Sequence, residues 1–289
     1  DNYRTNILIQ IQRYWDYRLG VYADIISSWE ELAKTALKEP GFGKQMFKHD
    51  QMFENLRETL GEGESDIEEI EMCYNYTRDY FLWNGLYTRS TENNLKQIYS
   101  TKYASSVEIN LFLCRLLREY GINSKLTYTS IRSNGWINEN YPFILQFNHV
   151  VCLIEIDGKT YFLDAINKQR PYTLPPANLL DTKAFILDYN EPQIKMIDTD
   201  FIFDKMSVIN ADVKDGKIKA KYQTRFKAYA ALEYRLIYAK DSSNFIKDYL
   251  LNATADYEIE NPIVVNFKEK EKPLLCQCEF TTSEGLQRF

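Results

Sequence analysis

Apolar residues recur at helical spacing through the first part of the chain. Ser28-Trp29-Glu30-Glu31 has the form of a capping box, so a helix is predicted to begin there and to end near Pro40-Gly41. A second capping box, Ser105 with Glu108, opens the most apolar stretch, which should end at Gly121. Further helices are predicted over 51–60, 66–82 and 93–99.

The predicted helix over 66–82 carries one continuous stripe at helical spacing, and this stripe should face the core. Only Thr77 among its members is weakly polar. The stripe consists of Ile67, Ile70, Tyr74, Thr77 and Phe81.

After Gly121 the pattern changes to the alternation of strands. Asp157-Gly158 is a hairpin signal, so the segments on either side of it should pair as antiparallel neighbours. Helices followed by an antiparallel sheet are typical of an α+β core. Strands are predicted over Ser124–Ile131, Phe147–Ile156, Thr160–Ile166 and Ala184–Leu187.

The residue patterns at the two ends of the chain predict further strands outside this core. Asn6–Gln12 alternates isoleucine with mostly polar residues, which predicts a strand, and a lone strand needs partners. We therefore expect 1–15 to be the last strand of an upstream β domain, 16–195 to be the core, and 196–289 to be a second, β-rich domain, with truncation at its end left open as an alternative. In that domain Asp215-Gly216 predicts a turn, and helical inserts are predicted over Tyr222–Ala239 and Ser242–Leu251.

Composition favours a globular protein and restricts its partners. The 289 residues are 45% hydrophobic and 26% charged, and the formal net charge of -6 gives no basic field for a nucleic acid. The 22 tyrosines and 16 phenylalanines suit sheet faces, or surfaces that contact carbohydrate or peptide. Sheet packing is the simpler interpretation of these aromatic residues, and a protein or peptide ligand stays open as a partner.

The cysteines indicate neither a disulfide framework nor a metal site. There are five, an odd number, and none has metal-ligand spacing, so no cofactor and no metal is expected. No calcium-binding loop of the Asp-x-Asp-x-Asp-Gly type is present. No segment reaches the roughly 18 apolar residues of a membrane span, and no signal peptide stands at the start. Because the first residue is not Met, we expect a mature or truncated product.

Three motifs together resemble the transglutaminase-like superfamily, whose papain-like core usually reads Gly-Asp-Cys-Lys-Asp-Lys-Ala, an apolar helix, Gly-Ile, Phe-Asn-His-Val and Leu-Asp-Ala. Here Gly121-Ile122, Asn148-His149 and Leu163-Asp164 fit well, whereas the first motif is degenerate. The resemblance covers roughly residues 16–190. At the degenerate Gly, Asp, Cys, second Asp and Ala positions stand Ala104, Ser105, Ser106, Glu108 and Asn110.

The resemblance implies a fold, a location and a site. The fold is a helical plus antiparallel-sheet core followed by a β-rich domain, as in large bacterial envelope proteins, which implies a periplasmic or secreted location. The five unpaired-looking cysteines argue against an oxidising compartment. The site is a Cys-His-Asp triad whose positions are occupied here by Ser106, His149 and Asp164.

Serine changes the chemistry of that triad. A helix N-terminus lowers the pKa of a thiol, but it cannot usefully ionise an aliphatic hydroxyl. Structural alternatives also exist, because Ser105 and Glu108 are sufficient as a capping box and a half-buried His149 can simply be retained from an ancestral site. Cys73, Cys114 and Cys152 have the positions of core cysteines and do not replace the nucleophile. Trp83-Asn84-Gly85 resembles an aromatic wall of the family cleft, although a core or turn role is the simpler interpretation.

Two hypotheses follow. In the first, the domain has lost acyl-transfer activity and acts as a binding or scaffolding module. In the second, it is an amide or ester hydrolase, such as a peptidase, that uses Ser106, His149 and Asp164. An enzyme should place Ser106 Oγ within about 3 Å of a His149 ring nitrogen. A scaffold can instead let Tyr103 or another aromatic side chain fill that space.

Overall fold

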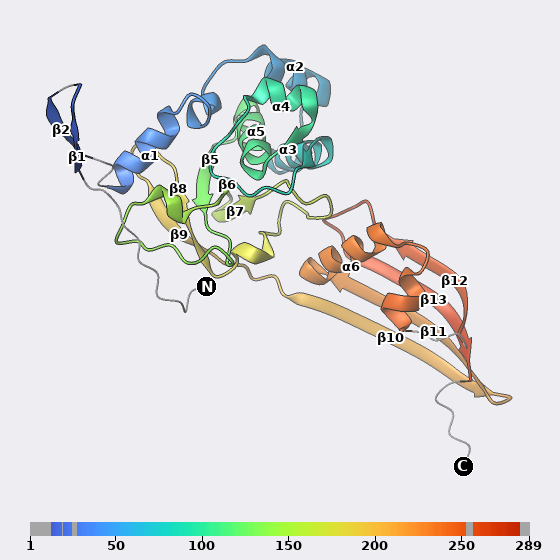
Figure 1. Cartoon of the computed structure of the whole chain (residues 1–289). Helices are drawn as coiled ribbons and strands as arrows, with labels where there is room; N and C mark the ends of the chain where they lie inside the picture. The colour runs from blue at the N-terminus through green and yellow to red at the C-terminus, as the bar shows by residue number, and fades with distance from the viewer. Residues whose placement is uncertain (1–12, 19, 25–27, 253–256, 284–289) are drawn as a thin grey trace. The chain divides into compact units, whose positions relative to one another are not determined.

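The computed structural model describes residues 13–18, 20–24, 28–252 and 257–283. By internal contacts the chain divides into two compact units, coloured from blue to yellow and from yellow to red in Figure 1. Unit 1 holds the described residues up to Lys168 together with Pro175–Thr199, and unit 2 holds Gln169–Leu174 and the described residues from Asp200 onward. The strand predicted over Asn6–Gln12 lies outside the described residues.

The helices of unit 1 follow the predicted pattern closely. Ser28 caps the first one, since its Oγ accepts a hydrogen bond from the Glu31 amide at 3.2 Å. The stripe on the helix over 66–82 begins only at Ile70, because Ile67 lies in the first turn and is 44% exposed. The helices are α1 Trp29–Lys38, η1 Gly43–Met46, α2 Gln51–Leu60, α3 Asp66–Tyr80, α4 Leu95–Thr101, α5 Ser106–Glu119, η2 Ile144–Gln146 and η3 Ala177–Leu179.

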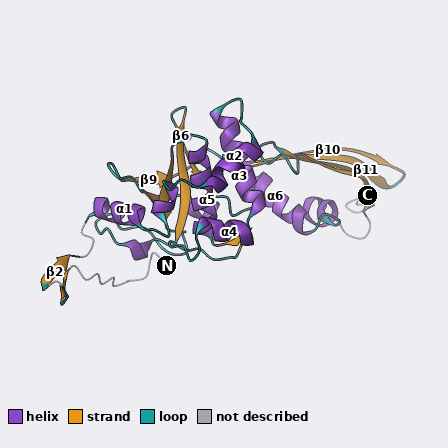
Figure 2. Ribbon diagram, turned by 90° about the horizontal axis from the view of Figure 1, so that it is seen from above, coloured by secondary structure: helices purple, strands orange, loops and turns teal. Residues whose placement is uncertain are grey.

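Helix α5 is the centre of unit 1. It is buried on every side from Ser106 to Leu117, and it packs against α2, α3 and α4 as well as against the sheet strands β5 and β6. Figure 2 shows α5 between these helices and β6. Because no side of α5 faces water, each polar residue on it needs a partner inside the protein.

A five-stranded antiparallel sheet lies against α5, in the order β7-β6-β5-β8-β9. The predicted hairpin between β6 and β7 is confirmed, since Asp157 and Gly158 have φ values of 49° and 73°, as a type I′ turn requires. The strands are β5 Ser124–Thr129, β6 His149–Ile156, β7 Lys159–Leu163, β8 Thr182–Ile186 and β9 Gln193–Ile197.

Two further pairs of short strands occur in unit 1. β1 Arg13–Asp16 pairs with β2 Val21–Asp24 in antiparallel fashion. β3 Leu82–Trp83 pairs in parallel with β4 Tyr103–Ala104, which directly precedes α5. This second pair holds the segment after Trp83 close to the N-terminus of α5.

Unit 2 is a four-stranded antiparallel sheet in the order β10-β11-β13-β12, covered on one face by α6 and η4. The predicted Asp215-Gly216 turn joins β10 to β11 and is confirmed, with φ values of 53° and 69°. The elements are β10 Phe203–Lys214, β11 Lys217–Lys227, α6 Ala228–Lys240, η4 Phe245–Leu251, β12 Glu258–Val265 and β13 Leu274–Thr282.

The helix predicted over Tyr222–Ala239 begins later than expected. Residues up to Lys227 belong to strand β11, and the helix starts at Ala228. Tyr222 and Phe226 are buried while Gln223 is exposed, which is the two-residue period of a half-buried strand. The prediction of a helix over Tyr222–Lys227 was therefore wrong, because the sheet partner β13 decides the conformation there.

Across the described ranges, no helix is long and apolar enough to cross a membrane.

Arg235 organises the connection between β12 and β13. It is 1% exposed, and its guanidinium donates to the carbonyl oxygens of Asn266, Glu269, Lys270 and Lys272 at 2.6–3.0 Å. Removal of the guanidinium takes away four hydrogen bonds that hold this connection in place.

We expect Arg235→Met to destabilise unit 2 by about 3 kcal/mol or more. Hydrogen exchange of the β11 and β13 amides in the full chain measures this change. Arg225→Met is the matched control, because Arg225 makes only a half-exposed ion pair with Asp204 at 3.8 Å. Equal effects of the two substitutions would contradict the role given to Arg235.

Candidate functional site

The structure brings Ser106, His149 and Asp164 together inside unit 1. Ser106 is the first residue of α5, His149 is the first residue of β6, and Asp164 directly follows β7. His149 Nδ1 lies 3.1 Å from Ser106 Oγ, and His149 Nε2 lies 3.3 Å from Asp164 Oδ2. The three side chains are almost completely buried, at 0%, 0% and 1% exposure.

The two contacts of the His149 ring determine which of its nitrogens carries the proton. An ionised Asp164 only accepts hydrogen bonds, so His149 carries its proton on Nε2 and offers the lone pair of Nδ1 to the Ser106 hydroxyl. The Ser106 hydroxyl donates to that nitrogen and accepts from the Thr88 amide at 3.3 Å. The line therefore has the hydrogen-bond order of a nucleophile, a general base and an orienting carboxylate.

Asn110 fixes the carboxylate of this line. Its Nδ2 donates to Asp164 Oδ1 at 2.9 Å and to the Val150 carbonyl at 2.8 Å, and its Oδ1 accepts from the Ala165 amide at 2.9 Å. Sequence analysis did not assign this role to Asn110. The available signal was its position one turn after Ser106, where a polar residue interrupts an otherwise apolar helix face.

Glu108 ties the start of α5 to the preceding loop. Its carboxylate accepts from the amide and hydroxyl of Ser105 and from the amides of Glu92 and Asn93. Burial by itself would raise the pKa of Glu108, but these hydrogen bonds outweigh it and hold the pKa below its usual value. The capping box predicted from Ser105 and Glu108 is thus present.

The segment Leu86–Thr88 closes the site. The Ser106 amide donates to the Leu86 carbonyl at 3.1 Å, so the donor at the helix N-terminus that could stabilise an oxyanion is already used. The Tyr87 ring stands edge-on against the His149 ring with centroids 4.9 Å apart. Its hydroxyl accepts from Asn178 Nδ2 at 3.2 Å, which holds the ring in place.

The aromatic side chain over the site is thus Tyr87, and sequence analysis missed it. Tyr103, considered for this place, is 54% exposed on β4. The turn role of Asn84-Gly85 is confirmed, because Gly85 has φ 86° and Asn84 Oδ1 accepts from the Leu86 amide. Trp83 supports the closing segment, since its Nε1 donates to the Leu86 carbonyl and its ring contacts Tyr87.

No cysteine replaces Ser106. All five are free and buried, and burial raises the pKa of the Cys73 and Cys152 thiols well above the usual value. The second histidine, His49, is exposed and contacts Glu54. Within the described ranges, no group of three or more His, Cys, Asp or Glu side chains could hold a metal ion.

Comparison with known proteins gives little further information. No family model matches the chain, and no curated protein matches it. The crystal structure of a putative protease from Parabacteroides distasonis ATCC 8503 is similar, with 10% sequence identity and a TM-score of 0.44. The match covers 93% of this chain but 63% of that one, so the chain spans less than two thirds of the protein that it resembles. The transglutaminase-like family stays a prediction.

We expect Asn110→Ala to destabilise unit 1 by about 2–4 kcal/mol, because it removes one donor to Asp164 Oδ1, one donor to the Val150 carbonyl and the side-chain acceptor of the Ala165 amide, all at buried residues. Hydrogen exchange of the β6 amides measures the loss. Asn123→Ala, at an exposed position, should change stability by less than about 0.5 kcal/mol. A small effect of Asn110→Ala would show that the amide network does not stabilise the fold.

Glu108 should make unit 1 sensitive to acid. A carboxyl whose pKa is lowered on folding stabilises the folded state above its unfolded pKa, and this contribution is lost as the pH falls through the folded value. Glu108→Gln should therefore be less stable than the natural chain at neutral pH, and the difference should shrink in acid well below the usual pKa of 4.5. Urea unfolding at a series of pH values tests this expectation. A difference that is independent of pH would contradict it.

Proposed function

We propose that unit 1 is a transglutaminase-like domain that has lost acyl-transfer activity and serves as a binding or scaffolding module for a protein or peptide. The single observation that carries this proposal is the closure of the site. Ser106 has no exposed surface, and its amide is bonded to Leu86. A substrate carbonyl therefore has no path to the hydroxyl, and the Ser106 amide is not available as an oxyanion donor.

The identity of the nucleophile supports the same proposal. A thiol at the N-terminus of α5 beside His149 would ionise readily, whereas a serine hydroxyl needs the general base to remove its proton during attack. In the closed arrangement the polar atoms of Ser106, His149, Asp164 and Asn110 satisfy one another. Such a network stabilises the junction of α5 with β6 and β7 without any reaction.

The family assignment itself rests on order and position along the chain. A buried helix that begins at Ser106, a strand that begins at His149 and a strand that ends before Asp164 occur in the order that the superfamily pattern requires. A β-rich unit follows, as in the envelope proteins that the sequence resembles. A periplasmic or secreted location is part of this proposal and rests on the resemblance alone.

One observation favours a second candidate, an amide or ester hydrolase. The Ser106 to His149 and His149 to Asp164 distances of 3.1 Å and 3.3 Å meet the geometric requirement for a nucleophile and its base. In this alternative the segment Leu86–Thr88 moves away to admit the substrate, and the Ser106 amide becomes an oxyanion donor. Opening would break at least the Ser106 to Leu86 and Thr88 to Ser106 hydrogen bonds.

Chemical labelling of the folded chain separates the two candidates. We expect a fluorophosphonate probe to leave Ser106 unmodified, and we expect iodoacetamide to modify the thiol of Ser106→Cys only after unfolding, because the position is buried. The natural chain, with its five buried cysteines, is the background control. Mass spectrometry of the peptide that contains residue 106 reads both reactions.

Phosphonylation that disappears in Ser106→Ala would overturn the silent module in favour of the hydrolase. Rapid alkylation of the folded Ser106→Cys chain would show that the segment Leu86–Thr88 opens in solution. Tyr87→Ala then provides a further test, because removal of the ring that lies against His149 should raise the labelling of Ser106→Cys if this segment limits access to position 106.

A further inference from the structure

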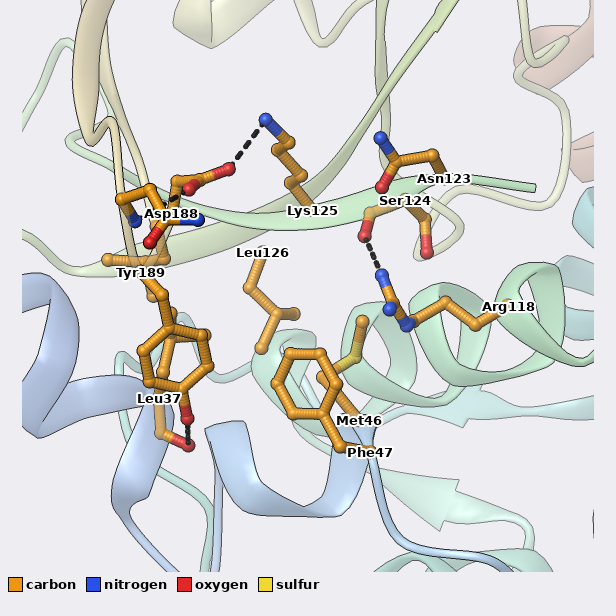
Figure 3. A pocket seen from close by; sticks show the side chains of 12 residues that line it. Leu37, Met46, Phe47, Arg118, Asn123, Ser124, Lys125, Leu126, Asp188 and Tyr189 are labelled. Carbon is orange, nitrogen blue, oxygen red and sulfur yellow. Dashed lines mark hydrogen bonds and ion pairs between the residues drawn. The ribbon is translucent and has the colours of Figure 1, made fainter. Parts of the chain in front are cut away.

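Unit 1 has a pocket at the end of α5 that lies opposite to Ser106 (Figure 3). Arg118 lines it and stands twelve positions beyond Ser106 on α5, or about 18 Å along the helix axis. The other walls come from η1, from the first residues of β5 and from the loop after β8. The pocket is thus separate from the Ser106, His149 and Asp164 site.

Two aromatic rings form its exposed walls. Phe47 and Tyr189 are 51% and 38% exposed, and their ring centroids lie 5.8 Å apart. Tyr189 is held by its hydroxyl, which donates to the Leu37 carbonyl at 3.2 Å. Leu126, 1% exposed, lies between these walls in Figure 3. Two neighbouring aromatic rings that keep this much exposed surface beside an apolar residue indicate a place where an apolar group binds.

The size of the pocket limits that group. Its volume is about 170 Å³. An apolar cavity of about 150 Å³ holds one benzene molecule. The pocket therefore suits a single aromatic ring or a branched aliphatic side chain.

The charges around the pocket are not balanced. Lys125 and Asp188 neutralise each other through an ion pair of 2.7 Å, which also lowers the pKa of Asp188 to about 2. Arg118 donates to the Ser124 carbonyl at 3.1 Å and lies over the Phe47 ring at 4.8 Å, but it has no carboxylate partner among the residues that the structure describes. The adjacent Glu119 pairs with Arg115 instead.

We propose that this pocket binds a carboxylate group carried next to a single aromatic ring. The ring packs against the exposed surfaces of Phe47 and Tyr189, and the carboxylate accepts hydrogen bonds from the guanidinium of Arg118. The planar, always charged guanidinium suits a carboxylate better than a neutral hydroxyl, which excludes an uncharged sugar as the preferred ligand. The carboxylate can belong to a free aromatic acid or to the C-terminal residue of a peptide. The proposal does not depend on whether Ser106 is silent or active.

Calorimetric titration of the natural full chain tests the chemistry without any substitution. The probe is N-acetylphenylalanine, and its matched neutral partner is N-acetylphenylalaninamide. We expect the amide to bind at least about tenfold more weakly, which is the loss expected for one hydrogen bond between charged groups. Equal binding of acid and amide, or no saturable binding of the acid, would overturn the proposal.

Two substitutions test whether the probe binds in this pocket. Phe47→Ala and Arg118→Gln should each weaken the acid about tenfold or more, and Arg118→Gln should also abolish the preference for acid over amide. The controls are Tyr141→Ala and Arg132→Gln, which remove an exposed aromatic and an exposed guanidinium elsewhere in unit 1. Unchanged affinity in both pocket variants would overturn the assignment.

A second pair of probes distinguishes the source of the carboxylate. These are a glycine-rich pentapeptide that ends in phenylalanine with a free C-terminus and the same peptide with a C-terminal amide. Tighter binding of the free-ended peptide than of N-acetylphenylalanine identifies a chain end as the ligand, and weaker binding identifies a free acid. Either result supports the shared chemistry, whereas a preference for the amidated peptide contradicts it.

Discussion

The burial of helix α5 is the constraint on which the rest of unit 1 depends. From Ser106 to Leu117 no residue of this helix faces water, yet the helix carries Ser106, Glu108, Asn110 and Arg115. A buried polar group without a partner costs about 1–3 kcal/mol, so each of these side chains has to find one in the surrounding elements. Arg115, for example, pairs with Glu119 and lies over the Phe53 ring.

These partners join parts of the chain that are distant in sequence. Glu108 fixes the loop at Glu92 and Asn93, and Asn110 fixes the residues around β6 and β7. Ser106 and His149 complete the set at the helix N-terminus. The arrangement that resembles a catalytic triad is therefore also what allows a polar helix start to be buried, and the same contacts suit a silent module and a hydrolase.

The silent module and the hydrolase differ in whether a substrate can reach Ser106. The segment Leu86–Thr88 supplies a carbonyl to the Ser106 amide, an amide to the Ser106 hydroxyl and an aromatic ring to His149. The pocket at the other end of α5 has the opposite character, since its aromatic rings are exposed and its arginine has no described carboxylate partner. Unit 1 thus combines a closed polar site with an open apolar pocket on one helix.

The sequence by itself determined features that depend on neighbours along the chain. Ser28 and Ser105 marked helix starts, Asp157-Gly158 marked the hairpin, and the order of Ser106, His149 and Asp164 indicated one site. Capping and turn formation involve residues a few positions apart, so their signals can be read directly.

Only the tertiary structure decided which distant groups meet. The closure of the site by Tyr87 and the exposure of Phe47 beside Arg118 left no local pattern, because each depends on how separate elements pack. The polar position of Asn110 on an apolar helix could be seen in the sequence, but its partner Asp164 could not. The segment Tyr222–Lys227 was mispredicted for the same reason, because its pairing with β13 overrides its helical spacing. Local preferences amount to a few tenths of a kcal/mol per residue, whereas burial and sheet pairing contribute more, so the long-range contacts decide.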